Sequence, residues 1–378
     1  MTRRDWLTLG LAFVSGACAR AKRTGYSGYA LIATSGENSL AVIDLTTFRL
    51  LKSIQLGGAP TFVVSADASG VSYVLTPSTD SVHIIDQNLS LTSSHRLGDG
   101  IQEIRLFPNS LGLVASARRS RELIYADAKS LKVLRRIKLD AEPISMDVSP
   151  QSGAGLAAVS TGSHGAVELI DIASGNHSRI PIGSKVGAVR FRGDGQMLLV
   201  ARPTERTVMG IDVKTRQVVA ELPLAMEPDN LCFNSDHGQL FVSGEGMDGI
   251  AIVFPYNTME VDQTLLAGRN PGIMAASGPT PAYLFVASAN GSDVTILNID
   301  TRRLIGIVDV GGQADFITVT PDNRFALVLD KTSGSMAVIN ILAIRTDGAA
   351  TREKNGASLF TLVDVGAQPV HVAVVARA

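Results

Sequence analysis

A pattern of four short apolar runs recurs along this chain, and it constrains the fold more than any other feature. Each unit ends its third run at a marker position, and the markers recur about every 42 residues. The runs are rich in Val, Ile and Leu and are separated by Gly, Pro, Asn and Asp, which indicates short β-strands. A unit of this length that already holds four strands and four turns has no room for a long helix. The markers are Asp44, Asp86, Asp127, Asp171, Asp212, Phe254, Asn298 and Asn340.

Eight such units predict an all-β, eight-bladed β-propeller of four-stranded antiparallel blades over residues 28–378. A single blade cannot bury both of its apolar faces, so each blade must pack on two neighbours. Seven blades and a rearranged unit form the alternative.

The units resemble the YVTN-type propeller repeat of bacterial surface and periplasmic proteins. The segment Ile317-Thr318-Val319-Thr320-Pro321-Asp322-Asn323 followed by Phe325-Ala326-Leu327-Val328 matches the first half of that repeat. The segments Val42-Ile43-Asp44 and Ile54-Gln55-Leu56-Gly57 match the second half. The resemblance covers roughly residues 28–376 and extends to the cytochrome d1 and lactonase-like propellers. It implies the fold but no particular activity. In that family each blade begins with the Pro-containing strand nearest the axis, so the resemblance implies that this chain starts with a second strand (Tyr29 to Ala33) and ends with a first strand, Pro369 to Val375. The last strand is therefore expected to complete the first blade in a 3+1 closure.

The N-terminal segment, residues 1–21, reads as a signal peptide. Arg3-Arg4 precedes an apolar stretch from Trp6 to Ala17, which is too short for an ordinary membrane-spanning helix. The Arg-Arg-x-aromatic-Leu order resembles twin-arginine signals, which predicts export to the periplasm or cell envelope. Ala17-x-Ala19 fits ordinary cleavage, whereas Gly16-Ala17-Cys18 fits a lipoprotein site with lipid on Cys18. An uncleaved anchor is a further alternative.

Charge and cysteine content exclude several classes of function. The formal net charge of −1 gives no electrostatic reason to expect nucleic acid, and a membrane partner is expected only through the signal or a lipid anchor. Beyond Cys18 only Cys232 remains, and no Cys-x-x-Cys-His motif for covalent haem is present. The sequence thus predicts a monomer that carries no cofactor.

The marker aspartates could bind a metal or act as acids and bases, but their recurrence at the same position of each unit favours a structural role. Asp and Asn side chains accept hydrogen bonds from backbone amides in the turn that follows them. Equivalent positions of neighbouring blades are too far apart to share a metal. We therefore expect these residues to shape the turn after each third strand.

The first strand of each blade lines the channel and supplies the candidate ligand-binding residues. Counted from the start of each strand, one position reads Val64, Arg105, Asp147, Arg190, Cys232, Ala275, Thr318 and Ala373. An unpaired buried charge is costly, so Asp147 is predicted to form an ion triad with Arg105 and Arg190. Two residues earlier, Glu103, Asn230 and His371 border the channel mouth. These six polar residues form a ligand or anion site, or they satisfy one another and hold water.

Basic loops from the third and fifth blades could add an anion-attracting sector on the same face. They contain Arg118-Arg119-Ser120-Arg121 and Arg202 to Arg206, with Lys185 nearby. The last unit also carries an extra polar loop, Thr346 to Gly356, which is predicted to be mobile.

Three functions compete for a chain with these features. The first is a non-enzymatic scaffold in the cell envelope that binds a protein partner or a small ligand. The second is a lactonase-like hydrolase with Glu103, Arg105, Arg190 and His371 at the channel mouth. The third is a redox propeller resembling the d1-haem domain, with His371 as the axial candidate.

Overall fold

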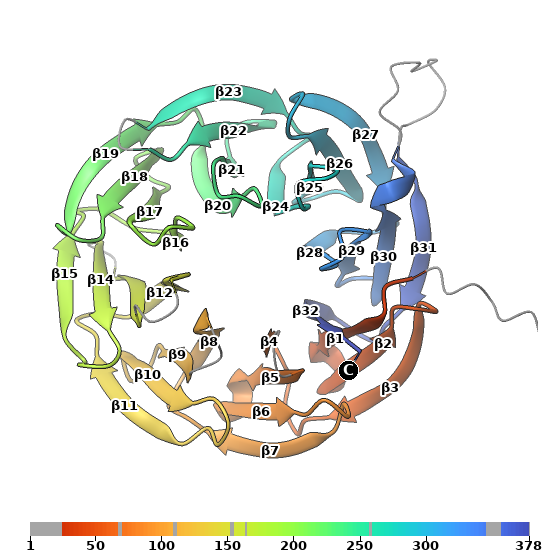
Figure 1. Cartoon of the computed structure of the whole chain (residues 1–378), viewed down its shortest axis with the longest axis horizontal. Helices are drawn as coiled ribbons and strands as arrows, with labels where there is room; N and C mark the ends of the chain where they lie inside the picture. Colours follow the sequence, from red (N-terminus) through yellow and green to blue (C-terminus); the bar gives the residue numbers. More distant parts are fainter. Residues whose placement is uncertain are drawn as a thin grey trace, which may run out of the picture.

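Eight four-stranded antiparallel sheets stand around a central axis in the computed structural model (Figure 1). It describes residues 25–377 apart from 67–69, 109–111, 152–154, 163–164, 257–258 and 345–356. The prediction of eight blades is confirmed, and the seven-bladed alternative is wrong because each unit forms its own sheet. The signal segment, Cys18 and the whole of the extra loop from Thr346 to Gly356 lie outside the described residues. Within the described ranges, no helix is long and apolar enough to cross a membrane.

The strands of each blade follow one another from the axis outward. Blade 1 consists of β32 (Pro369–Ala376), β1 (Gly28–Thr34), β2 (Ser39–Asp44) and β3 (Arg49–Gln55). Blade 2 consists of β4 (Phe62–Ala66), β5 (Val71–Thr76), β6 (Ser81–Ile85) and β7 (Leu91–Arg96). Blade 3 consists of β8 (Ile101–Leu106), β9 (Gly112–Ala117), β10 (Glu122–Asp127) and β11 (Val133–Lys138). Blade 4 consists of β12 (Pro143–Val148), β13 (Leu156–Thr161), β14 (Ala166–Asp171) and β15 (His177–Pro181).

The other four blades follow the same order. Blade 5 consists of β16 (Val189–Phe191), β17 (Met197–Arg202), β18 (Thr207–Asp212) and β19 (Gln217–Pro223). Blade 6 consists of β20 (Glu227–Phe233), β21 (Leu240–Glu245), β22 (Gly249–Phe254) and β23 (Glu260–Leu266). Blade 7 consists of β24 (Pro271–Ala276), β25 (Tyr283–Ser288), β26 (Asp293–Asn298) and β27 (Arg303–Asp309). Blade 8 consists of β28 (Ala314–Val319), β29 (Phe325–Asp330), β30 (Ser335–Asn340) and β31 (Leu359–Asp364). Short 3-10 helices lie at η1 (Ser35–Glu37), η2 (Pro77–Thr79) and η4 (Ile341–Ala343).

The predicted 3+1 closure is confirmed in blade 1. The C-terminal strand β32 pairs antiparallel with β1, from Gly28 opposite Ala376 to Thr34 opposite Pro369. Just beyond β32, the Arg377 guanidinium donates to the Tyr29 hydroxyl at 2.8 Å and to the Asp44 carboxylate at 3.0 Å. The closing strand is therefore held by its ladder with β1 and by the Arg377 side chain, which joins it to β1 and to β2.

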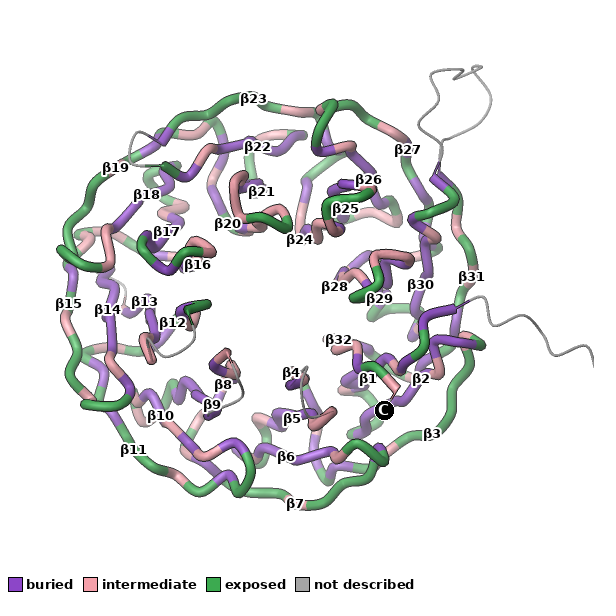
Figure 2. The backbone as a smooth tube through the Cα atoms, in the orientation of Figure 1, coloured by how far each residue is buried: buried purple, intermediate pink, exposed green. Residues whose placement is uncertain are grey.

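Apolar packing between neighbouring blades forms the core. The middle strands are buried almost completely, whereas the outermost strands, such as β3, are exposed (Figure 2). The buried apolar residues fall into eight clusters, and each cluster joins two adjacent blades around the ring. The Tyr73 hydroxyl in blade 2 also donates to the Ala128 carbonyl in blade 3 at 2.7 Å. Each apolar face is thus covered by the next blade, as expected from units that cannot bury both faces alone.

The marker aspartates shape turns, as predicted. Asp44 accepts from the Thr46 amide at 2.7 Å, and Asp127 accepts from the Ser130 amide at 2.8 Å. The same bond recurs at Asp86, Asp171, Asp212, Asn298 and Asn340. These side chains are used locally by the turn after each third strand, which leaves the inner strands as the source of a common site.

Candidate functional site

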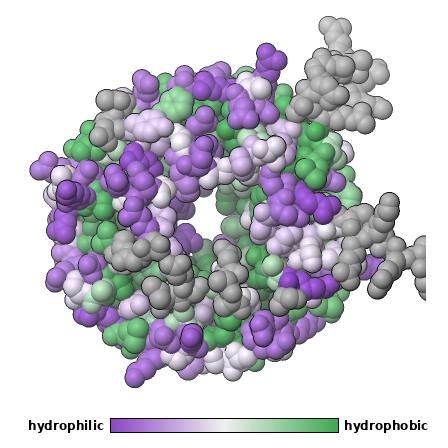
Figure 3. All heavy atoms as spheres, viewed as in Figure 1, coloured by the Kyte–Doolittle hydropathy of each residue, from purple (hydrophilic) through white to green (hydrophobic). Residues whose placement is uncertain are grey.

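The six predicted site residues all lie on innermost strands, around an open channel (Figure 3). On β8, Glu103 and Arg105 are half-buried on either side of the fully buried Ile104. Because the buried position packs between blades, its two neighbours in the strand face the axis. The other four residues occupy matching places: Asp147 on β12, Arg190 on β16, Asn230 on β20 and His371 on β32.

Two carboxylates of the channel hydrogen-bond to the inner strand of the next blade. Glu103 accepts from the Met146 amide at 3.1 Å, which joins blade 3 to blade 4. Asp147 accepts from the Phe191 amide at 2.7 Å, which joins blade 4 to blade 5. Both side chains therefore have a structural role between blades.

The prediction that Asp147 forms ion pairs with both Arg105 and Arg190 is wrong. Arg105 pairs with Glu103 of its own strand at 2.6 Å, because side chains two residues apart on a strand lie on the same face. Its guanidinium also lies 5.1 Å from the centre of the Phe62 ring. Among the described residues, Asp147 forms no direct ion pair with either arginine. It lies in the field of both, with Arg190 exerting the larger effect.

Burial sets the protonation of this cluster. It raises the pKa of Glu103 and of Asp147, and the fields of Arg105 and Arg190 oppose that rise. Burial also raises the pKa of the Cys232 thiol to about 11, so this group is not a thiolate nucleophile near neutral pH.

His371 lies between two phenyl rings of the flanking blades. Its ring centre is 4.0 Å from that of Phe62 and 4.3 Å from that of Phe316. Burial, helped by the charge of Arg105, lowers its pKa to about 3, so the imidazole is neutral at physiological pH. Its Nδ1 is buried without a hydrogen-bond partner among the described residues. The alignment that identified His371 also placed Phe62 and Phe316 in the same column, but their contact required the structure.

Arg190 differs from the other charged residues of the channel, because its charge has the fewest direct partners among the described residues. Its Nη1 donates to the carbonyl of Val189 at 2.7 Å. No carboxylate of the described residues lies within ion-pair distance of it. Its field nevertheless acts on Glu103, Asp147 and Cys232, so it lies close to all three. A half-buried guanidinium with unused donors can bind an anionic or carbonyl group.

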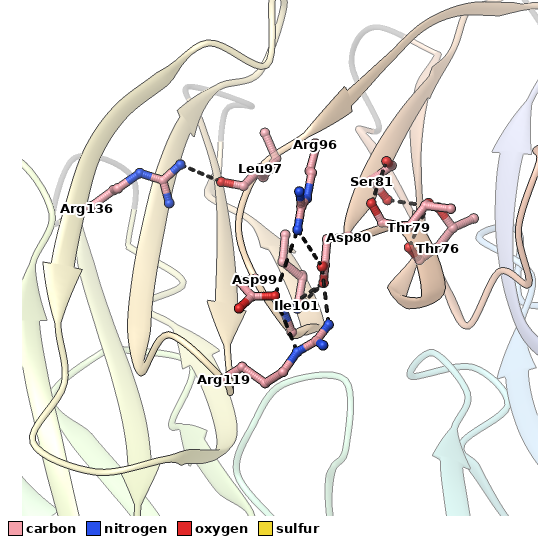
Figure 4. Close-up of polar contacts among 11 residues, drawn as sticks. Thr76, Thr79, Asp80, Ser81, Arg96, Leu97, Asp99, Ile101, Arg119 and Arg136 are labelled. Carbon is pink, nitrogen blue, oxygen red and sulfur yellow. Dashed lines mark hydrogen bonds and ion pairs between the residues drawn. The ribbon is translucent and has the colours of Figure 1, made fainter.

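Acidic side chains pair with most arginines of the predicted basic loops, whereas Arg121 and Lys185 have no carboxylate within ion-pair distance among the described residues. Arg96 and Arg119 both converge on the buried carboxylate of Asp80, at 3.4 and 3.3 Å (Figure 4). That carboxylate also accepts from the amides of Gly100 and Ile101 at the corner of blade 3. The other pairs are Arg118–Glu142, Arg202–Glu205, Arg202–Glu221 and Arg206–Glu227.

Three cavities adjoin the ring. One of about 430 Å³ lies at the channel mouth over blades 3 to 5 and is lined by Gln102, Ile144 and Lys185 among others. A second of about 310 Å³ lies at the same mouth over blades 6 and 7 and includes Asn230. A third of about 830 Å³ opens on the opposite face. Its Asp171 and Asp212 side chains already accept hydrogen bonds from backbone amides of the adjacent turns. The sequence did not predict the two cavities at the channel mouth, because each is lined by residues of more than one blade.

Comparison with known proteins supports the fold alone. No family matches the chain. A seven-bladed β-propeller protein of Mycobacterium tuberculosis is 27% identical over 142 residues, and the match spans 35% of this chain and 35% of that protein. The match therefore covers about a third of the relative's length and does not set the blade number.

Two solved structures are similar in fold at low identity. The dihydro-haem d1 dehydrogenase NirN, in complex with DHE, has a TM-score of 0.72 at 14% identity and covers 92% of this chain and 75% of its own. The β-propeller domain of Cps50 (Swd1) from Myceliophthora thermophila has a TM-score of 0.60 at 14% identity and covers 75% of this chain and 96% of its own. At such identities, the likeness carries no functional assignment.

Proposed function

We propose that this chain is an exported, non-enzymatic propeller scaffold of the cell envelope that binds a small ligand in its central channel. The single observation that carries the proposal is Arg190. The other channel charges have structural partners, since Arg105 is paired with Glu103 and both carboxylates bind backbone amides. Arg190 has unused donors, and no carboxylate of the described residues lies within ion-pair distance of it, although Glu103 and Asp147 lie within its field. A ligand with a carboxylate, phosphate or carbonyl oxygen would accept hydrogen bonds from the unused donors of the Arg190 guanidinium.

Export is the part of the proposal that rests on residues 1–21 and on the similarity of the repeat to envelope propellers. Arg3 and Arg4 are the residues that a twin-arginine signal requires. The double variant Arg3→Lys, Arg4→Lys should stay in the cytoplasm, whereas the unmodified chain reaches the envelope fraction. Mass spectrometry of the mature N-terminus would distinguish cleavage after Ala19 from lipidation of Cys18. Equal distribution of both forms would refute export by this signal.

Ligand binding can be tested with the purified mature chain. A library of small carboxylates, phosphates, sugars and amines would be screened by ligand-observed NMR. Hits should weaken in the Arg190→Gln variant and persist in Arg179→Gln, which changes a surface arginine of β15 paired with Asp140. If no hit depends on Arg190, the channel is not the binding site.

A haem-binding propeller is the second candidate, and His371 is the observation that favours it. The imidazole is neutral, which is the form that ligates iron, and it lies on an inner strand as the predicted axial candidate. NirN, the structural neighbour, is a dihydro-haem d1 dehydrogenase. His371 and Arg190 would hold such a group, which would supply redox chemistry. The absorption spectrum of protein purified from its native envelope decides this, since a colourless protein that takes up no haem refutes it.

The lactonase-like alternative draws less support from the contacts. Glu103, its candidate proton acceptor, is bound to Arg105 and to the Met146 amide. His371 has a pKa of about 3 and cannot carry a proton efficiently at neutral pH.

A further inference from the structure

The cavity of about 430 Å³ at the channel mouth combines an apolar wall with a cation. Pro143 and Ile144 of blade 4 contribute to the wall, and the Ile144 side chain is 42% exposed despite being apolar. Exposed aliphatic surface in a concave site is available to an apolar ligand group. The cavity is large enough for a ligand of a dozen heavy atoms.

Two cationic side chains line this cavity, and among the described residues only one of them lacks a carboxylate partner. The guanidinium of Arg118 is bound by Glu142 at 3.0 Å, so its charge is compensated. Lys185 is exposed and, among the residues that the structure describes, has no carboxylate partner. The ammonium group of Lys185 is therefore the cation that remains for a ligand.

The cavity adjoins the charged half of the channel. Gln102 and Ile144 line it, and the next residues of their strands are Glu103 and Ser145 in the channel. Lys185 precedes β16 in the same corner that leads to Arg190.

The opposite side of the channel at the depth of Arg190 carries small or apolar side chains. They are Val64 of β4, Ala275 of β24, Thr318 of β28 and Ala373 of β32. These residues leave room for an apolar group and offer no charge to compete with Arg190.

We infer that this cavity at the channel mouth binds an amphiphilic organic anion, with an apolar body that rests on Ile144 and a carboxylate that binds Lys185. The inference rests on the proposed ligand-binding function and specifies its ligand class. Neither a purely ionic nor a purely apolar molecule uses both the apolar wall and the cations.

A matched set of three probes tests this class by calorimetry and NMR on the mature chain. The set is 4-phenylbutyrate, the uncharged 4-phenylbutanol and the short anion butyrate. We expect 4-phenylbutyrate to bind with a Kd of about 1 mM or tighter, and the other two to bind at least about tenfold more weakly. Ile144→Ser and Lys185→Gln should each weaken 4-phenylbutyrate several-fold.

Matched variants control for surface effects. Lys331→Gln changes an exposed lysine in the β29–β30 loop of blade 8, and Leu134→Ser changes a leucine that is 54% exposed on β11. Both should bind the probe as the unmodified chain does. Absence of 4-phenylbutyrate binding, or binding that Ile144→Ser and Lys185→Gln leave unchanged, overturns the inference. If another ligand then proves to depend on Arg190, the proposed function survives without this ligand class. If no ligand depends on Arg190, both fail.

Discussion

His371 should make the propeller less stable in acid, by an amount that its environment sets. Its pKa falls from 6.5 in the unfolded chain to about 3 in the folded ring, so the unfolded chain takes up a proton that the folded one excludes. Stability is then fully present above pH 6.5 and is lost as the pH falls toward 3. At pH 4 the loss from this one group is about 3 kcal/mol, since each pKa unit is worth about 1.4 kcal/mol.

The His371→Phe variant isolates this effect, because a third phenyl ring can occupy the space between Phe62 and Phe316 but does not titrate. Urea unfolding at pH 7 and pH 4 gives the free energy of unfolding for both proteins. We expect the unmodified chain to lose about 3 kcal/mol more than the variant between these two pH values. Burial raises the pKa values of Glu103 and Asp147, which acts in the opposite direction, but it does so in both proteins.

Two controls make the result specific. His95→Gln changes an exposed histidine of β7 and should keep the pH dependence of the unmodified chain. NMR titration of the histidine side chains should show one imidazole, absent from His371→Phe and from His371→Gln, that stays neutral at pH 5. An imidazole of His371 that titrates near pH 6.5 would refute the reasoning, as would equal acid sensitivity of the unmodified chain and His371→Phe.

Three further outcomes follow from other contacts. Replacing Asp80 by Ala removes the acceptor of two buried amides at the next blade's corner, and should lower the free energy of unfolding by about 2–4 kcal/mol in urea titrations; a loss below about 0.5 kcal/mol would be too small for that role. Tyr73→Phe removes one hydrogen bond between blades 2 and 3 and should cost about 1 kcal/mol by the same assay, whereas no change would mean that the bond contributes nothing. Deleting β32 (Pro369–Ala376) opens the ring, so small-angle scattering should show a larger radius and the cooperative unfolding transition should be lost; an unchanged radius would contradict closure by this strand.

The sequence predicted the ring and its turns because both depend on a repeated local pattern. An Asp or Asn stands at the marker position in every unit except the sixth, which has Phe254, so its role in the turn could be deduced without any knowledge of distant contacts. The strand order of the family that the repeat resembles predicted that Pro369 to Val375 closes blade 1, since the first unit lacks its own inner strand. The ring and its turns needed only spacing and strand alternation, whereas the closure also needed that strand order.

Side-chain partners within the channel could not be read from the same alignment. The columns place Glu103, Arg105 and Asp147 on inner strands, but they do not say which carboxylate reaches which guanidinium. Arg105 forms its ion pair with Glu103 of its own strand, because Glu103 is two residues away and lies on the same face. The pairing of Arg118 and Arg119 could not be predicted for a similar reason, because their partners Glu142 and Asp80 come from other loops.

Inner strands of blades 3, 4 and 5 bring distant charges into one coupled group, and a double-mutant cycle between Asp147 and Arg190 tests this most directly. The free energy of unfolding would be measured for Asp147→Asn, Arg190→Gln, the double variant and the unmodified chain. Arg190 is the charge that most strongly favours ionised Asp147, so we expect a coupling energy of about 1–2 kcal/mol. Additive effects, within about 0.3 kcal/mol, would show that the two side chains do not share a site.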